Sequence, residues 1–309
     1  MTGRLMLLDT ASLYFRAFHG LPDTIRAPDG QPVNAVRGLL DMIARLITDF
    51  QPTELVACWD DNWRPHWRVA LLPAYKAHRL AAVVPGGNDV EQTPELLDAQ
   101  IPIIREVLGA LGIAVLGAQD HEADDVIGTL ATRARTPVDV ITGDRDLFQL
   151  VDDESAVRVV YTARGMSKLE LVTDAVVVAK YKIAPSLYAD FAVLRGDPSD
   201  GIPGVPGVGE KTAAGLLAEF GNLDGIIRAA ADPEIPLSAS VRSKIKASAA
   251  YLKVAPRVVR VVRDLDLPDV ETKIRPLDGP RVEALDSLST KWGLGGSMQR
   301  AVRAMGQAY

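Results

Sequence analysis

The sequence predicts an α/β protein with a central, mostly parallel sheet and helices on both faces. Four short apolar runs have the length of strands: residues 5–9, 55–60, 113–116 and 138–144. Residues 36–50 and 96–111 carry apolar side chains at the three- and four-residue spacing of amphipathic helices. Strands that alternate with helices usually pair in parallel, because each crossover helix returns the chain to the same edge of the sheet.

Acidic side chains follow three of the four predicted strands. Asp9, Asp60 and Asp144 stand at the ends of their runs. The carboxyl ends of parallel strands share one edge of the sheet, where such folds bind ligands, so we expect these carboxylates to converge. A further acidic group, residues 120–125, opens a predicted helix, where the helix dipole favours acids.

A second, mostly helical region is predicted after the sheet. Beyond residue 176 the chain consists of short helical segments broken by glycine and proline, above all at residues 201–209. We therefore expect a core over residues 1–176 and a helical region over residues 177–309. Glycines let backbone N–H groups approach a phosphate and a helix N-terminus adds positive potential, so this turn is a candidate phosphate clamp.

Charge is distributed unevenly along the chain, whose formal net charge is −6. Residues 62–88 hold four basic and no acidic side chains, and residues 240–263 hold seven basic and no acidic ones. Basic stretches of this kind suit phosphate backbones better than the net charge suggests. The pattern predicts an acidic centre between two nucleic-acid-binding surfaces.

Carboxylates are the main catalytic groups that the sequence offers. The four histidines lack the spacing of a zinc site, and neither a Gly-x-Ser-x-Gly nor a Gly-x-x-x-x-Gly-Lys-Ser/Thr motif is present. Hard cations such as Mg²⁺ and Mn²⁺ prefer carboxylate oxygens, and pairs of them commonly cleave phosphodiesters. No apolar run is long enough for a membrane span and Cys58 is the single cysteine, so we expect a cytoplasmic protein.

Six motifs stand in order along nearly the whole chain. They are Leu8-Asp9, Tyr14-Phe-Arg-Ala-Phe18, Tyr75-Lys-Ala-His-Arg79, Glu122-Ala-Asp-Asp125, Thr142-Gly-Asp-Arg-Asp146 and Gly196-Asp-Pro-Ser-Asp-Gly-Ile-Pro-Gly-Val-Pro-Gly-Val-Gly209. Together they resemble the flap endonuclease and 5′-3′ exonuclease family, which includes the 5′ nuclease domain of bacterial DNA polymerase I. Because the sequence ends at Tyr309, we expect a stand-alone relative of that domain.

The resemblance implies a PIN-like nuclease core, a helical arch at residues 62–88 and a helix-hairpin-helix clamp on duplex DNA. It also implies a structure-specific 5′ nuclease of replication and repair, active as a 5′-flap endonuclease and 5′-3′ exonuclease by a two-metal mechanism. The expected cofactors are two Mg²⁺ or Mn²⁺ ions, and Asp61 and Asp120 are spare acids for a third. The expected partner is DNA with a free 5′ end, bound by a monomer without any membrane.

Carried over by position, the resemblance assigns the site residues. Expected ligands of the first metal are Asp9, Asp60, Glu122, Asp124 and Asp144. Expected ligands of the second are Asp125, Asp146, Asp197 and Asp200. Lys76 and Arg79 are expected to contact the scissile phosphate, with Tyr75 as a stacking platform for an unpaired base. Expected DNA contacts are Arg16, Tyr75, Lys76, Arg79, Gly204, Gly207, Gly209, Lys211, Thr212, Lys244 and Lys246.

Two departures from the family pattern and two alternatives qualify this interpretation. Asp61 follows Asp60 where the family has a small residue, and Gly201 replaces an asparagine, which would loosen Asp200. A PIN-type RNase would use a similar but smaller acid cluster, yet the glycine-rich clamp and the length beyond residue 176 argue against it. A non-catalytic DNA-binding relative would have lost acids that this chain retains.

Overall fold

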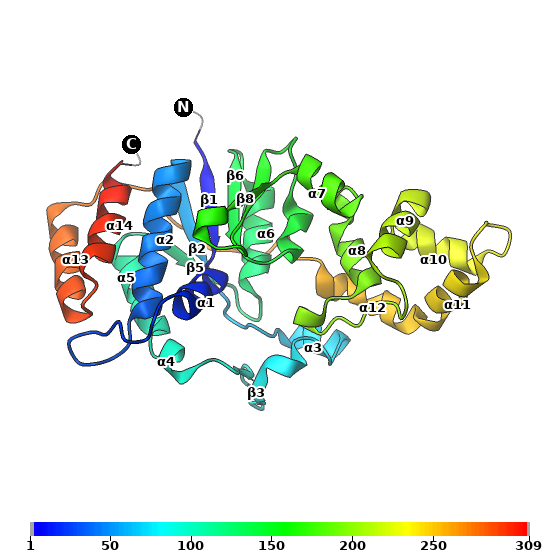
Figure 1. Cartoon of the computed structure of the whole chain (residues 1–309), viewed down its shortest axis with the longest axis horizontal. Coiled ribbons are helices and arrows are strands. Elements are labelled where there is room, and N and C mark those ends of the chain that lie inside the picture. Colours follow the sequence, from blue (N-terminus) through cyan, green and yellow to red (C-terminus); the bar gives the residue numbers. More distant parts are fainter. Residues whose placement is uncertain (1–2, 308–309) are drawn as a thin grey trace.

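The computed structural model describes residues 3–307 as an α/β core with a row of helices beside it (Figure 1). The core holds a six-stranded sheet in the order β5-β2-β1-β6-β7-β8. Its strands are β1 (Leu5–Asp9), β2 (Glu54–Cys58), β5 (Ala114–Leu116), β6 (Val138–Thr142), β7 (Val157–Tyr161) and β8 (Glu170–Val172). All neighbours pair in parallel except β7 and β8. The predicted mostly parallel sheet is confirmed, and β7 and β8 extend it beyond the predicted strands.

Alternate residues of β1 face two separate hydrophobic clusters. Leu5 and Leu7 pack in the cluster that contains α6 (Ala123–Arg133). Met6 and Leu8 pack in the cluster that contains α1 (Thr10–Gly20), α2 (Asn34–Phe50) and α5 (Ile101–Ala110). Apolar side chains therefore fill both faces, which is why the strand reads as a continuous apolar run.

The helical region continues the α6 side of the core. Its helices are α7 (Asp174–Tyr181), α8 (Tyr188–Arg195), α9 (Glu210–Phe220), α10 (Leu223–Ala231), α11 (Ala239–Ala247) and α12 (Ala249–Val259). Short 3-10 turns are η2 (Asp146–Leu150), η3 (Met166–Lys168), η4 (Pro185–Leu187) and η5 (Pro198–Asp200). Buried side chains of this region belong to the same cluster as Leu5 and Leu7, so the two parts share a hydrophobic core.

The segment over residues 62–88, which we call the arch segment, is less helical than expected. It contains α3 (His66–Leu71) and η1 (Ala77–Arg79), and its end forms a hairpin of β3 (Leu80–Ala82) with β4 (Val90–Glu91). Pro73 follows α3 and Pro85 lies in the hairpin loop, and neither residue continues a helix. The prediction of a helical arch is thus correct only for one short helix.

The predicted helix over residues 96–111 is divided. It consists of α4 (Glu95–Asp98) and α5, which has Pro102 in its first turn. Gln100 lies between them, and its side-chain oxygen accepts a hydrogen bond from the Ala35 amide at 2.8 Å. Proline favours a new helix start, so the apolar periodicity continues while the helix does not.

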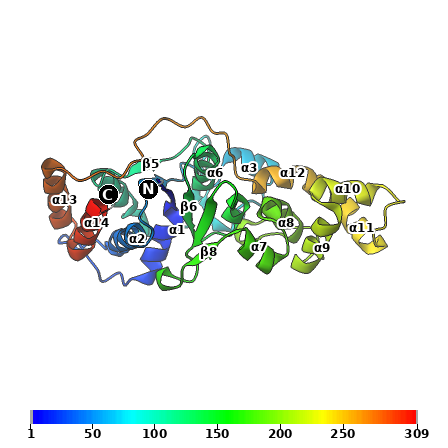
Figure 2. The same cartoon turned by 90° about the horizontal axis from the view of Figure 1, so that it is seen from above.

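The C-terminal helices depart from the predicted division at residue 176. Helices α13 (Gly279–Lys291) and α14 (Gly295–Gln307) lie beside α2 and α5, at the end of the molecule away from α9–α11 (Figure 1). The connection from α12 to α13 crosses the core (Figure 2) and passes the start of β2, where the Leu55 amide donates to the Thr272 carbonyl at 2.8 Å. Apolar side chains of α14 join the α2 cluster, so residues 279–307 belong spatially to the core. In residues 3–307 no helix has the length and apolarity to cross a membrane.

Candidate active site

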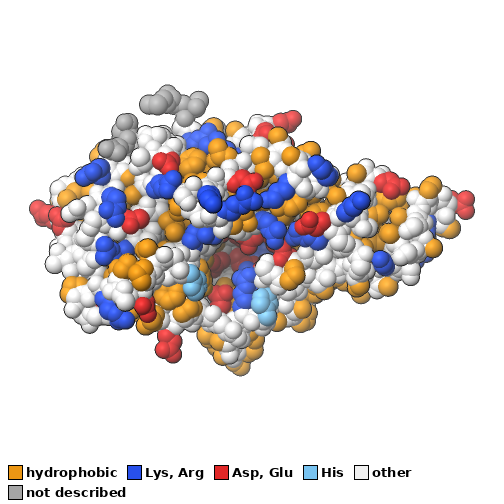
Figure 3. Space-filling model, viewed as in Figure 1, with side chains coloured by type: hydrophobic (Ala, Val, Ile, Leu, Met, Phe, Trp, Pro, Cys, Tyr) orange, Lys and Arg blue, Asp and Glu red, His pale blue; other side chains and the backbone are white. Residues whose placement is uncertain are grey.

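The carboxyl ends of β1, β2 and β6 open into a cavity of about 370 Å³. Figure 3 shows acidic side chains inside a hollow on this face, with Lys and Arg side chains beside it. Acids that line the cavity are Asp9, Asp60, Glu91, Glu122, Asp124, Asp144 and Asp197. A smaller adjoining space shares Glu122 and Asp124 and is also lined by Asp146 and Asp200. We call the two spaces together the acidic cavity.

The structure gathers all but one of the acids that were expected to bind metal. Six of them line the larger space, and Asp146 and Asp200 line the smaller one. The exception is Asp125, which lines neither. Strand ends supply Asp9, Asp60 and Asp144, as the parallel order requires, and their role as metal ligands stays a prediction.

Local hydrogen bonds fix the orientation of Asp9. As the N-cap of α1, its carboxylate accepts from the Ser12 amide at 3.2 Å and from the Thr142 hydroxyl at 2.6 Å. Burial raises the pKa of Asp9 to about 7, because it outweighs the opposing hydrogen bond from Thr142, and the charges of Asp60 and Asp144 add to the rise. Asp9 is therefore held in place without a cation beside it.

Among the described residues, no cation forms an ion pair with Asp124 or Asp146, although Lys76 acts to lower the pKa of Asp124 and Arg195 that of Asp146. Burial, and then the charges of Asp9 and Asp144, raise the pKa of Asp124 well above its ordinary value. Burial, and then Asp144 and Asp200, do the same for the pKa of Asp146. One oxygen of Asp146, Oδ1, is buried without a hydrogen-bond partner. We call Asp9, Asp124 and Asp146, for which the described residues provide no ion pair, the uncompensated acids.

A neighbouring group of acids is neutralised by cations of the arch segment. Glu122 accepts hydrogen bonds from Arg68 at 2.5 Å, from the Tyr75 hydroxyl at 2.6 Å and from Lys76. Burial acts to raise the pKa of Glu122, but Lys76 and Arg68 outweigh it and lower that pKa below its ordinary value. We call Glu122, Asp125, Arg68 and Lys76 the ion-paired cluster.

Two predicted site residues have surroundings that differ from the expectation. Asp125 is fully buried and accepts from Arg68 at 2.7 and 2.9 Å, from the Val262 amide at 2.8 Å and from the Glu122 amide at 3.3 Å. Both of its oxygens accept hydrogen bonds from protein groups, and its expected role as a metal ligand stays a prediction. Tyr75 is 4% exposed with its hydroxyl on Glu122, so packing in the core corrects the expectation of a stacking platform.

Asp197 and Asp200 lie between the cavity and nearby arginines. Asp197 accepts from Arg195 at 3.1 Å, and Asp200 accepts from Arg79 at 3.0 Å. Burial raises the pKa of Asp200 to about 6, although Lys76 opposes the rise. These two acids are thus intermediate between the uncompensated acids and the ion-paired cluster.

Gly201 brings the arch segment against Asp200. Its φ is +68°, and a Cβ there would lie 2.3 Å from the Ala74 carbonyl oxygen. The Lys76 amide donates to the Asp200 carbonyl at 2.9 Å across this contact. The expectation that Gly201 loosens Asp200 is wrong, because the missing side chain permits a backbone hydrogen bond that holds the two segments together.

The predicted duplex contacts lie on the helical region. Gly204 and Gly207 have φ values of +71° and +72°, and Gly209 precedes α9, whose N-terminus has no side-chain cap. Lys211 and Thr212 are exposed in the first turn of α9, and Lys246 is exposed on α11. Lys244 donates to the Gly207 carbonyl at 3.0 Å. Arg16 lies on α1 beside Gly143, close to the acidic cavity.

Sequence reasoning missed Arg68 and Glu91. Arg68 was counted among the arch bases without a role, and no local spacing indicates that it reaches α6. Glu91 lines the cavity from β4, and burial raises its pKa. The spare acid Asp61 points toward Arg105 of α5, at 3.8 Å.

The uncompensated acids fit divalent cations. They offer only carboxylate oxygens, which hard cations prefer, and Asp146 has a buried oxygen without a partner. Added positive charge would offset the mutual repulsion that raises their pKa values. Within the described part of the chain no three such side chains already surround one point, so binding would draw them closer together.

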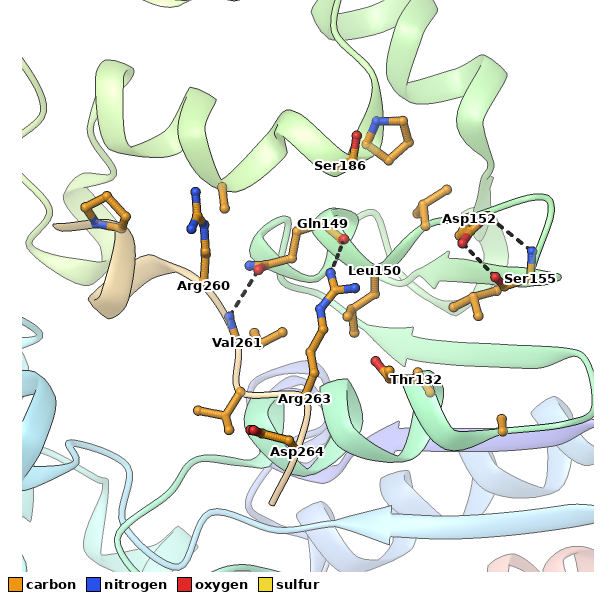
Figure 4. Close-up of a pocket in the computed structure, with 18 of the residues that line it drawn as sticks. Thr132, Gln149, Leu150, Asp152, Ser155, Ser186, Arg260, Val261, Arg263 and Asp264 are labelled. Carbon is orange, nitrogen blue, oxygen red and sulfur yellow. Dashed lines mark hydrogen bonds between the residues drawn. The ribbon is translucent and has the colours of Figure 1, made fainter. Parts of the chain in front are cut away.

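A larger cavity, of about 1320 Å³, lies away from these acids (Figure 4). It is bordered by α6, η2 and residues 260–264, and its charged side chains include both arginines and aspartates. None of the acids of the acidic cavity lines it. The larger cavity and the clustered carboxylates therefore lie in different places. Clustered carboxylates indicate a catalytic site more specifically than cavity volume does.

A carboxylate-lined cavity at the carboxyl edge of a parallel sheet, beside a glycine-rich helical region, defines a phosphodiester-cleaving nuclease. Family models agree with this class. The model for the 5′-3′ exonuclease N-terminal resolvase-like domain matches residues 4–182, and that for the 5′-3′ exonuclease C-terminal SAM fold matches residues 183–279. The chain belongs to the 5′-3′ exonuclease family and is a nuclease.

Curated relatives support the same membership. A 5′-3′ exonuclease of Streptomyces coelicolor is 57% identical over 97% of this chain and 99% of its own length. A 5′-3′ exonuclease of Mycobacterium tuberculosis is 49% identical over 99% of this chain and 98% of its own length. DNA polymerase I of Mycobacterium bovis is 42% identical over 91% of this chain, which corresponds to 30% of the polymerase.

Solved structures share the fold at low sequence identity. The bacteriophage T5 D15 protein co-crystallised with metal ions has a TM-score of 0.64 at 17% identity and covers 98% of this chain and 99% of its own. The catalytic core of Rad2 in complex with DNA substrate has a TM-score of 0.57 at 17% identity, with 100% and 93% coverage.

Proposed function

We propose that this nuclease hydrolyses DNA phosphodiesters near a free 5′ end, at flaps, gaps and nicks, with two Mg²⁺ or Mn²⁺ ions. The observation that carries the proposal is the acidic cavity with its uncompensated carboxylates, bordered by the arch segment and by the helical region. Two relatives of this chain are named 5′-3′ exonucleases. Of the solved structures with a similar fold, one was co-crystallised with metal ions and one is in complex with DNA substrate. We expect it to act as a monomer.

The acids of the cavity would hold the cations. Asp9, Asp60, Asp124 and Asp144 converge from strand ends and the α6 start, and Asp146 adds an oxygen without a partner. Bound divalent ions supply positive charge that activates water for attack and stabilises negative charge on the phosphate. Hydrogen bonds from Ser12 and Thr142 keep Asp9 oriented at the cavity.

Cations of the arch segment would position the phosphate. Lys76 and Arg79 both line the cavity, so a phosphate that enters it meets positive charge opposite the carboxylates. Lys76 is 9% exposed and paired with Glu122, and Arg79 is paired with Asp200. A phosphate would compete for these partners, which would release carboxylates toward the cations.

The helical region would hold duplex DNA through its backbone. The turn of Gly204, Gly207 and Gly209 presents the uncapped N-terminus of α9, an eleven-residue helix, to solvent. Lys211 and Lys246 lie exposed nearby. Contacts of this kind bind phosphates and do not distinguish between bases, so specificity would come from the shape of the DNA.

One assay tests the proposal against an RNase and against a non-catalytic relative. Labelled 5′-flap DNA, gapped duplex and single-stranded RNA are incubated with the full chain in Mg²⁺, Mn²⁺ or EDTA. We expect cleavage of flap DNA with either metal and none in EDTA. Survival of flap DNA in both metals, or a clear preference for RNA, would contradict the proposal.

A further inference from the structure

We propose that Arg68 is a positioning residue for cleavage: it holds the Glu122 carboxylate at the acidic cavity and links it to the helical region. The inference rests on the proposed function, in which Glu122 lines the cavity and pairs with Lys76, and on the proposed duplex-binding role of the helices. Arg68 lies on α3 and is 2% exposed; it borders the smaller space of the acidic cavity but does not line the larger space, where Lys76 and Arg79 would meet the phosphate. It would act on the reaction through the groups that it holds.

Every nitrogen of the Arg68 guanidinium has a partner. Nη1 donates to Glu122 at 2.5 Å and to Asp125 at 2.9 Å, and Nη2 donates to Asp125 at 2.7 Å. Nε donates to the Val258 carbonyl at 3.0 Å. Only the planar fork of arginine reaches three acceptor groups in this way, since a lysine ammonium donates from a single point. One side chain thus joins α3, α6 and the end of α12.

Asp125 completes the link from the other side. It is the third residue of α6, and with Glu122 it forms the reciprocal cap of that helix. Asp125 Oδ1, which accepts a hydrogen bond from Arg68 Nη2, also accepts one from the Val262 amide at 2.8 Å. Asp125 therefore orients Arg68, secures the first turn of α6, and fixes the chain that leaves α12.

The chain after α12 continues along η2, which begins at Asp146, and along α6, which carries Asp124 and Asp125. Val261 donates to the Gln149 side chain at 3.1 Å, and Arg263 donates to the Gln149 carbonyl at 2.7 Å (Figure 4). Leu265 donates to the Thr129 hydroxyl of α6 at 3.3 Å. Gln149 belongs to η2, which begins at Asp146. Any shift of α12 would therefore be transmitted to α6 and η2, and Arg68 transmits it to Glu122.

The test compares Arg68 with Arg64, a second buried arginine of the arch segment. Arg64 is 6% exposed and donates to the carbonyls of Tyr75 and Pro73 and to Asp89, so it touches no acid of the cavity. The variants are Arg68→Gln, Arg68→Lys and the matched control Arg64→Gln. Each is measured for melting temperature, for flap-DNA affinity in EDTA, and for single-turnover cleavage with enzyme in excess.

We expect Arg68→Gln to lower the single-turnover rate constant by about 100-fold, since a small misplacement of a reacting group has an effect of that order. Flap affinity should change by less than about threefold, because Arg68 makes no exposed contact. Arg68→Lys, which keeps the charge without the fork, should recover part of the rate. Arg64→Gln should retain the wild-type rate constant to within about threefold at saturating enzyme.

Hydrogen exchange gives a second readout that needs neither metal nor activity. Amides of residues 261–265 should exchange faster in Arg68→Gln, and no faster than wild type in Arg64→Gln. Equal rate losses in the two glutamine variants, or unchanged exchange in Arg68→Gln, would overturn the positioning role. A wild-type chain that leaves flap DNA intact would overturn the proposed function, while the exchange comparison would still decide the link. If Arg68→Gln does not fold, Arg68→Lys supplies the same comparison.

Discussion

Asp124 and Asp125 are neighbours in α6 with opposite electrostatic surroundings. Asp124 faces the acidic cavity, where burial and then Asp9 and Asp144 raise its pKa. Asp125 faces Arg68 and has both oxygens occupied. Adjacent helix positions point about 100° apart, so a single step along the chain changes the partner from carboxylates to a guanidinium.

The difference separates two uses of the same side chain. The uncompensated acids of the cavity store repulsion that a divalent cation can relieve, whereas the ion-paired cluster holds α3, α6 and α12 together. Functional sites commonly retain such unfavourable charge, and the rest of the fold stabilises them. Removal of a charge should therefore raise the free energy of unfolding among the uncompensated acids and lower it in the ion-paired cluster.

The largest expected effect is on Asp124→Asn. We expect cleavage of flap DNA to fall by about 10³-fold, as for loss of a group that stabilises the transition state. In EDTA the free energy of unfolding should rise by about 1 kcal/mol, because one repelling charge is gone. Denaturant titration measures the change in the free energy of unfolding, and a cleavage assay measures the change in rate. A loss of stability in EDTA would contradict the proposed difference between Asp124 and Asp125.

The matched change, Asp125→Asn, should destabilise the protein. It leaves the Arg68 charge buried with fewer partners, which typically costs about 3–5 kcal/mol. The melting temperature in EDTA should fall well below those of wild type and Asp124→Asn. Isothermal titration of Mg²⁺ or Mn²⁺ into folded Asp125→Asn should still show metal binding. Complete loss of binding would instead identify Asp125 as a metal ligand.

The pH dependence of stability sharpens the comparison. Burial raises the pKa of Asp9 to about 7 and that of Asp200 to about 6, both above the unfolded value of 3.8. Protonation then favours the folded state, so this contribution is fully present below about pH 4 and is lost as pH rises through 6 to 7. The melting temperature in EDTA should fall as pH rises over that range, and Asp9→Asn should make this fall smaller. An unchanged trend in Asp9→Asn would contradict this.

Gly201→Asn tests the contact between the arch segment and Asp200. Asparagine tolerates a φ of +68°, but its Cβ would meet the Ala74 carbonyl oxygen at 2.3 Å. We expect a loss of about 1–3 kcal/mol in unfolding free energy, as for overpacking, with a lower cleavage rate. Wild-type stability in thermal melts would show that the contact does not constrain the arch.

The smallest effect is expected for Lys246→Ala, which lies away from both groups of acids. Stability should change by less than about 0.5 kcal/mol, because the side chain is exposed. Flap-DNA affinity measured against salt concentration should lose about one unit of slope, as expected for one phosphate contact. An unchanged salt slope would remove Lys246 from the duplex surface.

The parallel pairing of the core strands and the convergence of Asp9, Asp60 and Asp144 could be predicted from the sequence, but the order of the strands in the sheet could not. Period and length identify buried strands, and parallel pairing then sends their carboxyl ends to one edge. The return of α14 to α2 could not be predicted, because an amphipathic helix does not specify which face it covers. The break between α4 and α5 depended on Pro102, whose effect the apolar spacing concealed.

The sequence by itself determined the chemistry of this protein, namely carboxylates at strand ends, basic stretches beside them and a glycine-rich turn before a helix. Only the tertiary structure decided which acids lie free and which are paired. Arg68 and Glu122 are 54 residues apart, and Asp125 and Val262 are 137 residues apart. Side-chain charge is a local property, but whether a charge is compensated depends on contacts that form only when distant segments pack.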